Sequence, residues 1–177
     1  MGQKWTKMAQ KRPKGTSRPR PAGRARTRRT PSLRGNALAT IDERGRLKLP
    51  AGFRRVVETN YGGELFLTSA RGDSMWLYPL SVWEEKERRL LTAPSRPPAV
   101  TRFLERVNYF GAEAELDGQG RVLVPPVLRK SARIDGEVAV LGALDHLDVW
   151  NNQVFQERLA REPFSDDDQQ VLAELGC

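Results

Sequence analysis

Cysteine and histidine are almost absent from this chain of 177 residues: the one cysteine is Cys177, the last residue, and the one histidine is His146. An intrachain disulfide needs two cysteines, and the usual metal motifs need several cysteines or histidines. Both are therefore excluded, and we expect no metal site. A chain without a disulfide framework fits the reducing cytosol best, which predicts a cytoplasmic protein.

Long apolar runs are also lacking. No stretch approaches the roughly 18 uncharged apolar residues that a membrane helix needs, and 38% of the residues are hydrophobic against 29% charged. The length suits one folded body, because compact domains usually hold roughly 100 to 150 residues. We therefore expect a single soluble body with no membrane partner.

Acidic side chains are missing from the first 34 residues, which hold 12 Lys and Arg. Residues 1–31 also contain four prolines and no apolar periodicity, and such a composition cannot offset its ordering entropy by burial. We predict that residues 1–34 form a disordered basic tail. Three hypotheses for this tail stay open: an arm that grips phosphates, an organelle transit peptide, and a translation start assigned too far upstream.

The net charge of +8 belongs to that tail. Residues 35–177 alone hold 18 basic and 22 acidic side chains, which is a net charge of −4. Bulk electrostatics thus gives no reason to expect that the folded part binds nucleic acid. If it does bind, it must use a few well-placed arginines.

What the body does contain is an internal repeat. Aligned without gaps, residues 39–54 and 114–129 are identical at 6 of 16 positions, and four further pairs are both apolar. Three pairs of segments align: "DERGRLKLP" with "DGQGRVLVP", "GELFLTS" with "GEVAVLG", and "MWLYPLSVWEE" with "LDVWNNQVFQE". Each repeat has only about 50 residues, a size at which a lone core is marginal. The two repeats must therefore share one core.

Each repeat predicts a strand, a tight turn, a strand, a short helix, a hairpin and a closing helix. In the first repeat we expect strands in "ALATI", "RLKLP", "ELFLTS" and "MWLYP". Pro50 is expected at the first position of the helix in "PAGFRRVV". Ser81 and Glu84 predict a capping box that opens the closing helix.

Two more helices are expected. "AVTRFLERVNYFGA" carries an apolar stripe at helical spacing, which predicts core packing: Val100, Phe103, Leu104, Val107 and Phe110. "SDDDQQVLAELG" has acids in its first turn, where the helix dipole favours them. It lacks the spacing and the glycine of an EF-hand, so we favour a helix start over a calcium loop.

The repeated turn presents the same chemistry twice. A single D-x-x-G-R is a common surface turn, but two copies at matching places predict a pair of rigid loops, each presenting a guanidinium. The aspartates can cap the turn amides, and the glycines can adopt a positive φ. The residues expected to hold the loops are Asp42 and Gly45 in the first copy, and Asp117 and Gly120 in the second.

These motifs resemble the MraZ family, whose two repeats each carry the D-x-x-x-R signature of the SpoVT/AbrB-like swapped-hairpin domain. The resemblance covers most of residues 33–162 and includes "RGN", "LYPLSVWEE", "FLERVNYFGAEAELDGQGRVLVPPVLR" and "VAVLG" followed by "LDVW". It implies a β-rich α+β fold in which two swapped-hairpin repeats form one pseudo-symmetric barrel with peripheral helices. The repeats would span 36–82 and 111–154, with a helical linker at 83–110 and a C-terminal helical segment at 155–177.

The same resemblance implies a function. It predicts a non-enzymatic bacterial transcriptional regulator, associated with the nucleoid, that binds repeated promoter DNA of the division and cell-wall gene cluster. It also implies a ring-shaped homo-oligomer of about eight or more subunits, with no cofactor and no small-molecule substrate. Matched residue by residue, Arg46 and Arg121 are the expected DNA contacts, since a guanidinium suits both phosphate and guanine.

This chain departs from the family pattern at two places. The second loop has Gly118 and Gln119 where the first has Glu43 and Arg44, so the first loop carries two arginines. We therefore expect Arg44 to add a DNA contact and the first repeat to dominate phosphate contact. Family members usually begin just before the Arg-Gly-Asn stretch, whereas 32 residues precede Leu33 here, which supports the hypothesis of a misassigned start.

Three alternative functions remain. An antitoxin of the swapped-hairpin type would also bind DNA, but it usually has one repeat per chain. An RNA- or ribosome-associated protein would act through the basic tail. An enzyme could use His146 with Asp145 and Asp148, but we predict a solvated polar cluster at a hairpin turn there, because no catalytic motif accompanies it.

Overall fold

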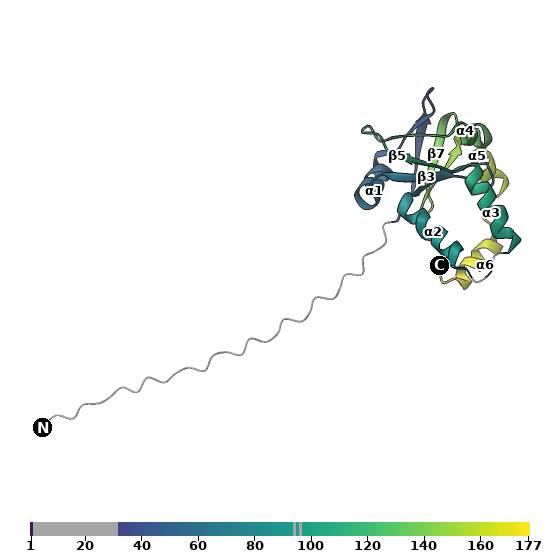
Figure 1. The fold of residues 1–177 in the computed structure, drawn as a ribbon. Helices are drawn as coiled ribbons and strands as arrows, with labels where there is room; N and C mark the ends of the chain where they lie inside the picture. Colours follow the sequence, from purple (N-terminus) through teal and green to yellow (C-terminus); the bar gives the residue numbers. More distant parts are fainter. Residues whose placement is uncertain (2–31, 94, 96) are drawn as a thin grey trace.

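The computed structural model describes Met1 and residues 32–93, 95 and 97–177. In this part of the chain, eight strands and six helices form a nearly closed antiparallel barrel with helices around it (Figure 1). The strand order is β5-β3-β4-β8-β7-β1-β2-β6. The two end strands, β5 and β6, are consecutive in the chain and joined by a tight turn, which brings the sheet close to closure. This confirms the predicted β-rich α+β barrel.

The two repeats contain equivalent elements. In the first repeat these are β1 (Asn36–Ile41), β2 (Arg46–Lys48), α1 (Ala51–Tyr61), β3 (Glu64–Thr68), β4 (Met75–Pro79) and α2 (Leu80–Thr92). In the second they are β5 (Ala112–Glu115), β6 (Arg121–Leu123), α4 (Pro126–Ala132), β7 (Gly136–Gly142), β8 (Leu147–Asn151) and α5 (Asn152–Arg161). Between them lies α3 (Pro98–Tyr109), and α6 (Asp166–Glu174) ends the chain.

The repeats exchange their first strands. β1 pairs with β7 of the second repeat, from Asn36 opposite Leu141 to Ile41 opposite Gly136. In the equivalent exchange, β5 of the second repeat pairs with β3 of the first repeat. The equivalent strands β2 and β6 pair with each other, and so do β4 and β8. The barrel is thus pseudo-symmetric, and neither repeat can form it alone.

One core serves both repeats, as expected. Residues that alternate along the strands point inward, so Leu47, Leu77, Val122 and Val149 from both halves are at most 1% exposed. The predicted stripe on α3 also packs as expected: Val107 is buried, and Phe103 and Leu104 pack beside it against a second cluster with Tyr78 and Trp83. Removing water from these side chains is the main source of stability in such a barrel.

The predicted tail extends too far. Leu33, at its end, is only 1% exposed, and its backbone exchanges hydrogen bonds of 2.8 and 3.0 Å with Leu144. Leu33 therefore belongs to the barrel and its core. Most of the predicted tail, residues 2–31, lies outside the described residues.

Two predicted helix starts are wrong. α2 begins at Leu80 with Pro79 as its N-cap and no side-chain cap, so Ser81 and Glu84 form no capping box. The reason is that β4 runs directly into the helix. A capping box does occur in α6, between Ser165 and Asp168. Pro50 is the N-cap of α1 rather than its first residue.

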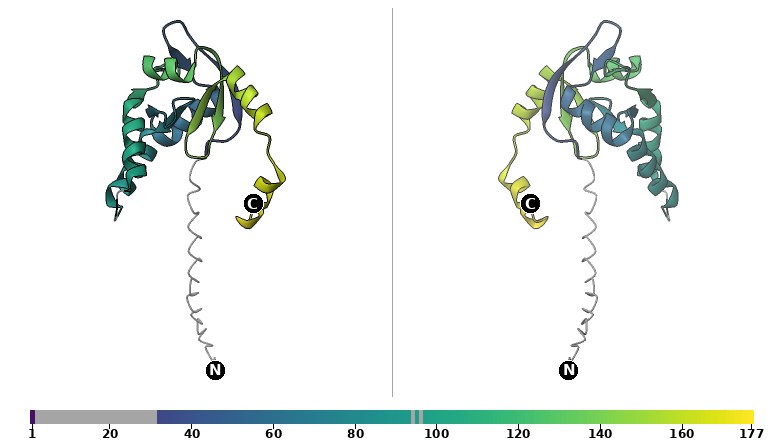
Figure 2. Two further views of the ribbon diagram at one scale, coloured as in Figure 1. Left: turned by 90° about the vertical axis from the view of Figure 1, so that its right-hand side faces the viewer. Right: turned by 90° about the vertical axis from the view of Figure 1, so that its left-hand side faces the viewer.

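The four helices α2, α3, α5 and α6 lie away from the turn between β1 and β2 of the first repeat (Figure 2). Figure 2 shows the pair α2 and α3 on one side of the barrel and the pair α5 and α6 on the opposite side, while the hairpin between β1 and β2 projects from the far end. Within the described residues, no helix has the length and apolar character needed to cross a bilayer.

Candidate nucleic-acid interface

The first turn is held by one carboxylate. Oδ1 of Asp42 accepts hydrogen bonds from the backbone amides of Arg44 and Arg46, at 3.0 and 2.9 Å. Its Oδ2 accepts from Nε of Arg46 at 2.9 Å and lies 2.8 Å from Nη2 of the same residue. Gly45, with φ +76°, closes the turn by donating to the carbonyl of Asp42. The sequence motif is therefore a rigid loop that also fixes one arginine side chain.

The second turn repeats this backbone, but the side chain of its arginine is not hydrogen-bonded to the aspartate. Oδ1 of Asp117 accepts from the amides of Gln119 and Arg121, at 2.8 and 2.9 Å. Gly120 has φ +72° and donates to the carbonyl of Asp117. Within the described part of the chain, the guanidinium of Arg121 makes no hydrogen bond or ion pair. The guanidinium of Arg121 is consequently the more available of the two for a ligand, while the larger share of phosphate contacts expected for the first repeat stays a prediction.

Each turn rests on an arginine from the helix of the other repeat. A Cβ on Gly120 would lie 2.5 Å from Cδ of Arg54, and one on Gly45 would lie 2.6 Å from Cζ of Arg129. Arg54 also donates through Nη2 to the carbonyl of Gly118, at 3.3 Å. Sequence reasoning assigned no role to these two arginines. The sequence did contain one sign of their importance, because Arg54 and Arg129 are one of the six identical pairs of the repeat.

Strands β2 and β6 carry the loops' arginines onto one surface. Leu47 pairs with Val122, and both are fully buried. Because side chains alternate along a strand and directly paired residues share a face, the flanking residues point outward. We call these four residues the outer ribbon face: Arg46, Lys48, Arg121 and Leu123.

The outer ribbon face brings the two expected contact arginines together. In its register, Arg46 is paired with Leu123, and Lys48 is paired with Arg121. Lys48 was not predicted to lie on this face, although its spacing of two from Arg46 in a strand places both side chains on one side. Arg44 is exposed at the tip of the first turn, which projects from the barrel in Figure 1.

The turns also lower the pKa values of their aspartates. The backbone hydrogen bond from Arg46, then its side-chain hydrogen bond, hold the pKa of Asp42 below its ordinary value of 3.8. For Asp117 the backbone hydrogen bond from Arg121 is the main cause of a lowered pKa. Both carboxylates are therefore stabilised in their charged form.

We expect Asp42→Asn/Asp117→Asn to lower the melting temperature at neutral pH. A folded pKa below the unfolded one contributes stability that is present above the unfolded pKa and is lost as pH falls through the folded value. The difference from wild type should thus shrink below pH 3.8, the ordinary aspartate pKa. Melting curves from pH 7 to 3 test this, with Glu113→Gln/Glu115→Gln on β5 as the control. A difference that stays constant with pH would contradict it.

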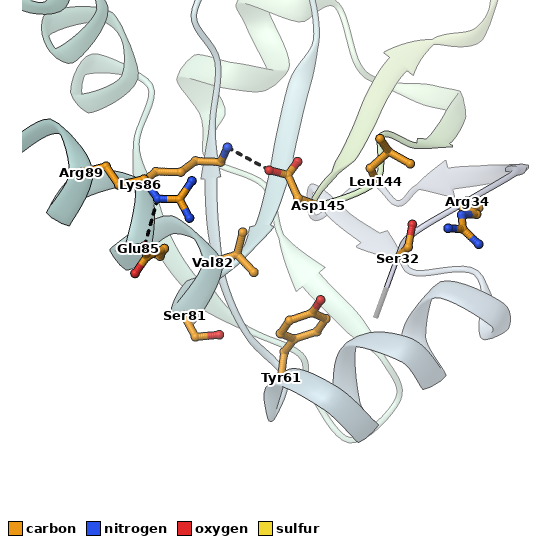
Figure 3. Close-up of a pocket in the computed structure, with 10 residues that line it drawn as sticks. All are labelled: Ser32, Arg34, Tyr61, Ser81, Val82, Glu85, Lys86, Arg89, Leu144 and Asp145. Carbon is orange, nitrogen blue, oxygen red and sulfur yellow. Dashed lines mark hydrogen bonds and ion pairs between the residues drawn. The ribbon is translucent and has the colours of Figure 1, made fainter. Parts of the chain in front are cut away.

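A cavity of about 530 Å³, shown in Figure 3, has no residue of the outer ribbon face in its lining. Its charged groups are largely paired: Lys86 with Asp145 at 2.8 Å, and Arg89 with Glu85 at 2.9 Å. The lining residues are Ser32, Arg34, Tyr61, Ser81, Val82, Glu85, Lys86, Arg89, Leu144 and Asp145. The pairing leaves neither carboxylate of this cavity unpartnered, so it offers no evident acid or base.

The polar cluster around His146 lies at a hairpin turn as expected, but it is less solvated than expected. The His146 side chain is only 16% exposed, stacks on Tyr78 with ring centroids 4.4 Å apart, and places Nδ1 2.7 Å from Asp145. Burial raises the pKa of Asp148. The cluster is thus packed between strands and helix α2. Among the described residues, no group of three or more His, Cys, Asp or Glu could hold a metal ion.

Comparison with known proteins now identifies the chain. A family model described as "MraZ protein, putative antitoxin-like" matches residues 33–106 and 111–174. The chain belongs to the MraZ family. The MraZ relatives include a protein of Acidobacterium capsulatum, 45% identical over 144 residues, and one of Koribacter versatilis, 42% identical over 145. Each alignment covers 81% of this chain and 99% of the relative.

A third MraZ relative, from Syntrophobacter fumaroxidans, is 30% identical over 129 residues, which are 73% of this chain and 85% of its own length. All three relatives are named "Transcriptional regulator MraZ". This confirms the resemblance read from the sequence. Membership in a family of transcriptional regulators also confirms the prediction that the chain is not an enzyme.

Proposed function

We propose that this MraZ protein regulates transcription by binding double-stranded promoter DNA with sequence specificity through its outer ribbon face. The observation that carries the proposal is the register of β2 and β6, which puts Arg46, Lys48 and Arg121 on one face that points away from the core, with Lys48 exposed and the two arginines partly exposed. The major groove of B-DNA admits a two-stranded β-ribbon. Arg46 and Arg121 are the contacts to bases or phosphates, Arg44 and Lys48 add phosphate contacts, and Asp42, Gly45, Asp117 and Gly120 hold the loops.

The charge distribution supports a local rather than a diffuse interface. The body has a net charge of −4 from residue 35 onward, yet three of the four residues on the outer ribbon face are cationic. An acidic body with a small basic surface suppresses nonspecific binding, because such binding depends on the number of phosphates contacted. A single copy with so few cationic side chains is expected to bind DNA weakly.

A ring-shaped homo-oligomer would resolve that low affinity. Several copies that display the outer ribbon face in register would engage successive DNA repeats, and each added contact would act at a high effective concentration. We propose such a ring on the promoter of the division and cell-wall gene cluster. Family resemblance supports both the ring and the target.

Binding to the chain's own upstream DNA tests the proposal. We expect the full chain to bind this duplex at least roughly a thousandfold more tightly than a shuffled duplex at about 0.15 M salt, the ratio usual for specific binding. Fluorescence anisotropy measures both affinities. Equal affinity for the two duplexes would remove the proposed function.

Deleting residues 2–31 separates the proposal from an RNA- or ribosome-associated function. We expect the deletion to keep the preference for upstream DNA and to reduce the salt dependence, because the lost segment holds most of the 12 basic residues before Gly35 and each phosphate contact steepens the salt slope. Anisotropy titrations at several salt concentrations provide the measurement. If the preference disappears with the segment, the tail and not the ribbon is the binding element.

A further inference from the structure

One residue of the outer ribbon face does not fit a purely phosphate-binding role. Leu123 is 61% exposed, although it is paired with Arg46 and lies in a surface that is otherwise cationic. Its two neighbours in the chain, Val122 and Val124, are fully buried. The alternation of side chains along the strand therefore places Leu123 on the outward side of β6.

The fold itself does not require an apolar side chain at this position. The equivalent position in the first repeat is Lys48, which is also exposed, and the two halves of the ribbon have the same backbone pairing. An exposed leucine loses water only when something covers it. If the outer ribbon face binds DNA as proposed, Leu123 lies beside Arg46 in that interface, where DNA is in a position to cover it.

Resting on the proposed function, we propose that Leu123 contacts the 5-methyl group of a thymine in the major groove, beside the base or phosphate bound by Arg46. Thymine is the only standard base that displays a methyl group there, and apolar side chains recognise it by contact. The register supports this pairing, because Leu123 and Arg46 are directly opposite each other. The second half of the ribbon would then read a thymine where the first half, with Lys48, binds phosphate.

The thymine methyl can be removed without changing base pairing. We propose to amplify the upstream duplex either with dTTP, or with dUTP and primers that carry uracil in place of thymine, which replaces every thymine by uracil. Wild type is expected to lose about threefold or more in affinity on the uracil duplex, since burying one methyl group contributes about 0.8 kcal/mol, close to a fourfold change. Leu123→Ala is expected to bind both duplexes with a ratio close to one.

The matched control is Leu91→Ala at the end of α2, where the side chain is 69% exposed and lies outside the ribbon. This variant should discriminate between the duplexes as wild type does. Circular dichroism and the size of each variant show that fold and assembly are kept. Uracil also changes the stiffness of the duplex, which affects every variant alike. The deciding quantity is therefore the ratio of affinities for the thymine and uracil duplexes measured with wild type, divided by the same ratio measured with Leu123→Ala.

Three results would overturn the inference. Wild type could bind both duplexes equally, or Leu123→Ala could lose as much as wild type. Leu123→Ala could also change the assembly without any effect of the methyl group, which would make Leu123 a contact between copies. In each of these cases the proposed function still stands if the protein prefers upstream over shuffled DNA and if this preference depends on Arg46 and Arg121. If that preference is absent, the proposed function and the role of Leu123 both fail.

Discussion

Arg46→Ala/Arg121→Ala is expected to lower the affinity of the full chain for its upstream DNA by roughly thirtyfold or more, because a good bidentate arginine contact discriminates by about 1–3 kcal/mol. The loss should be larger in an oligomer, where each copy contributes. Neither side chain belongs to the buried core, so the variant should fold. Anisotropy on upstream and shuffled duplexes, with a thermal melt, provides the measurement.

The two arginines should not contribute equally. Arg46 is held by Asp42 through two contacts, at 2.9 and 2.8 Å, whereas Arg121 is unpaired within the described residues. Arg46 is therefore preorganised, but its carboxylate partner offsets part of its charge. Arg121→Ala should accordingly reduce the salt slope by about one unit per subunit, and Arg46→Ala by less.

The control for the double variant is Arg102→Ala/Arg106→Ala on α3. It removes the same charge from exposed positions on a helix outside the ribbon. This control should keep most of the affinity and the full preference for upstream DNA. If both double variants lose affinity alike, binding depends on total charge. If the ribbon variant binds as wild type does, the repeated turn only closes the barrel.

The turns were predictable from the sequence because their chemistry is local. Asp42, Gly45 and Arg46 lie within five residues, and the spacing alone specifies which amides the carboxylate can reach. The second copy in residues 117–121 strengthened the prediction, since one such turn is common. The shared core followed from the small size of each repeat.

What the sequence did not predict depends on contacts between distant residues. The pairing of β2 with β6 decides that Lys48 and Leu123 share a face with the two arginines, and this register is set by tertiary packing. The contact of Arg54 with the turn of the second repeat spans more than 60 positions in the chain. The partial burial of His146 has the same origin, because its ring stacks on Tyr78, which belongs to the other repeat.

Gly120→Val is expected to destabilise the protein by about 2–4 kcal/mol. A β-branched residue is strained at φ +72°, which costs about 1–3 kcal/mol. Its Cβ would also lie 2.5 Å from Cδ of Arg54, so this arginine must leave its place under the turn. For a domain of this size the melting temperature should fall by roughly 10 °C. Thermal melts of wild type and variant measure it.

Gly118→Val is the matched control, because it adds the same side chain two residues earlier in the same turn. Gly118 has no positive φ, and a Cβ added there would meet no heavy atom within 4 Å. The equivalent residue of the first turn is Glu43, so the loop accepts a side chain there. Gly118→Val should therefore melt close to wild type.

The same pair of variants connects loop geometry with DNA binding. At a temperature where both are folded, Gly120→Val should bind upstream DNA more weakly than Gly118→Val, because the strained turn no longer directs Arg121 onto the outer ribbon face. Equal binding by the two variants would mean that the direction of Arg121 is unimportant, and its charge alone would then account for its role. Equal stability would mean that the turn relaxes around a side chain, and the glycine would not be what holds the loop.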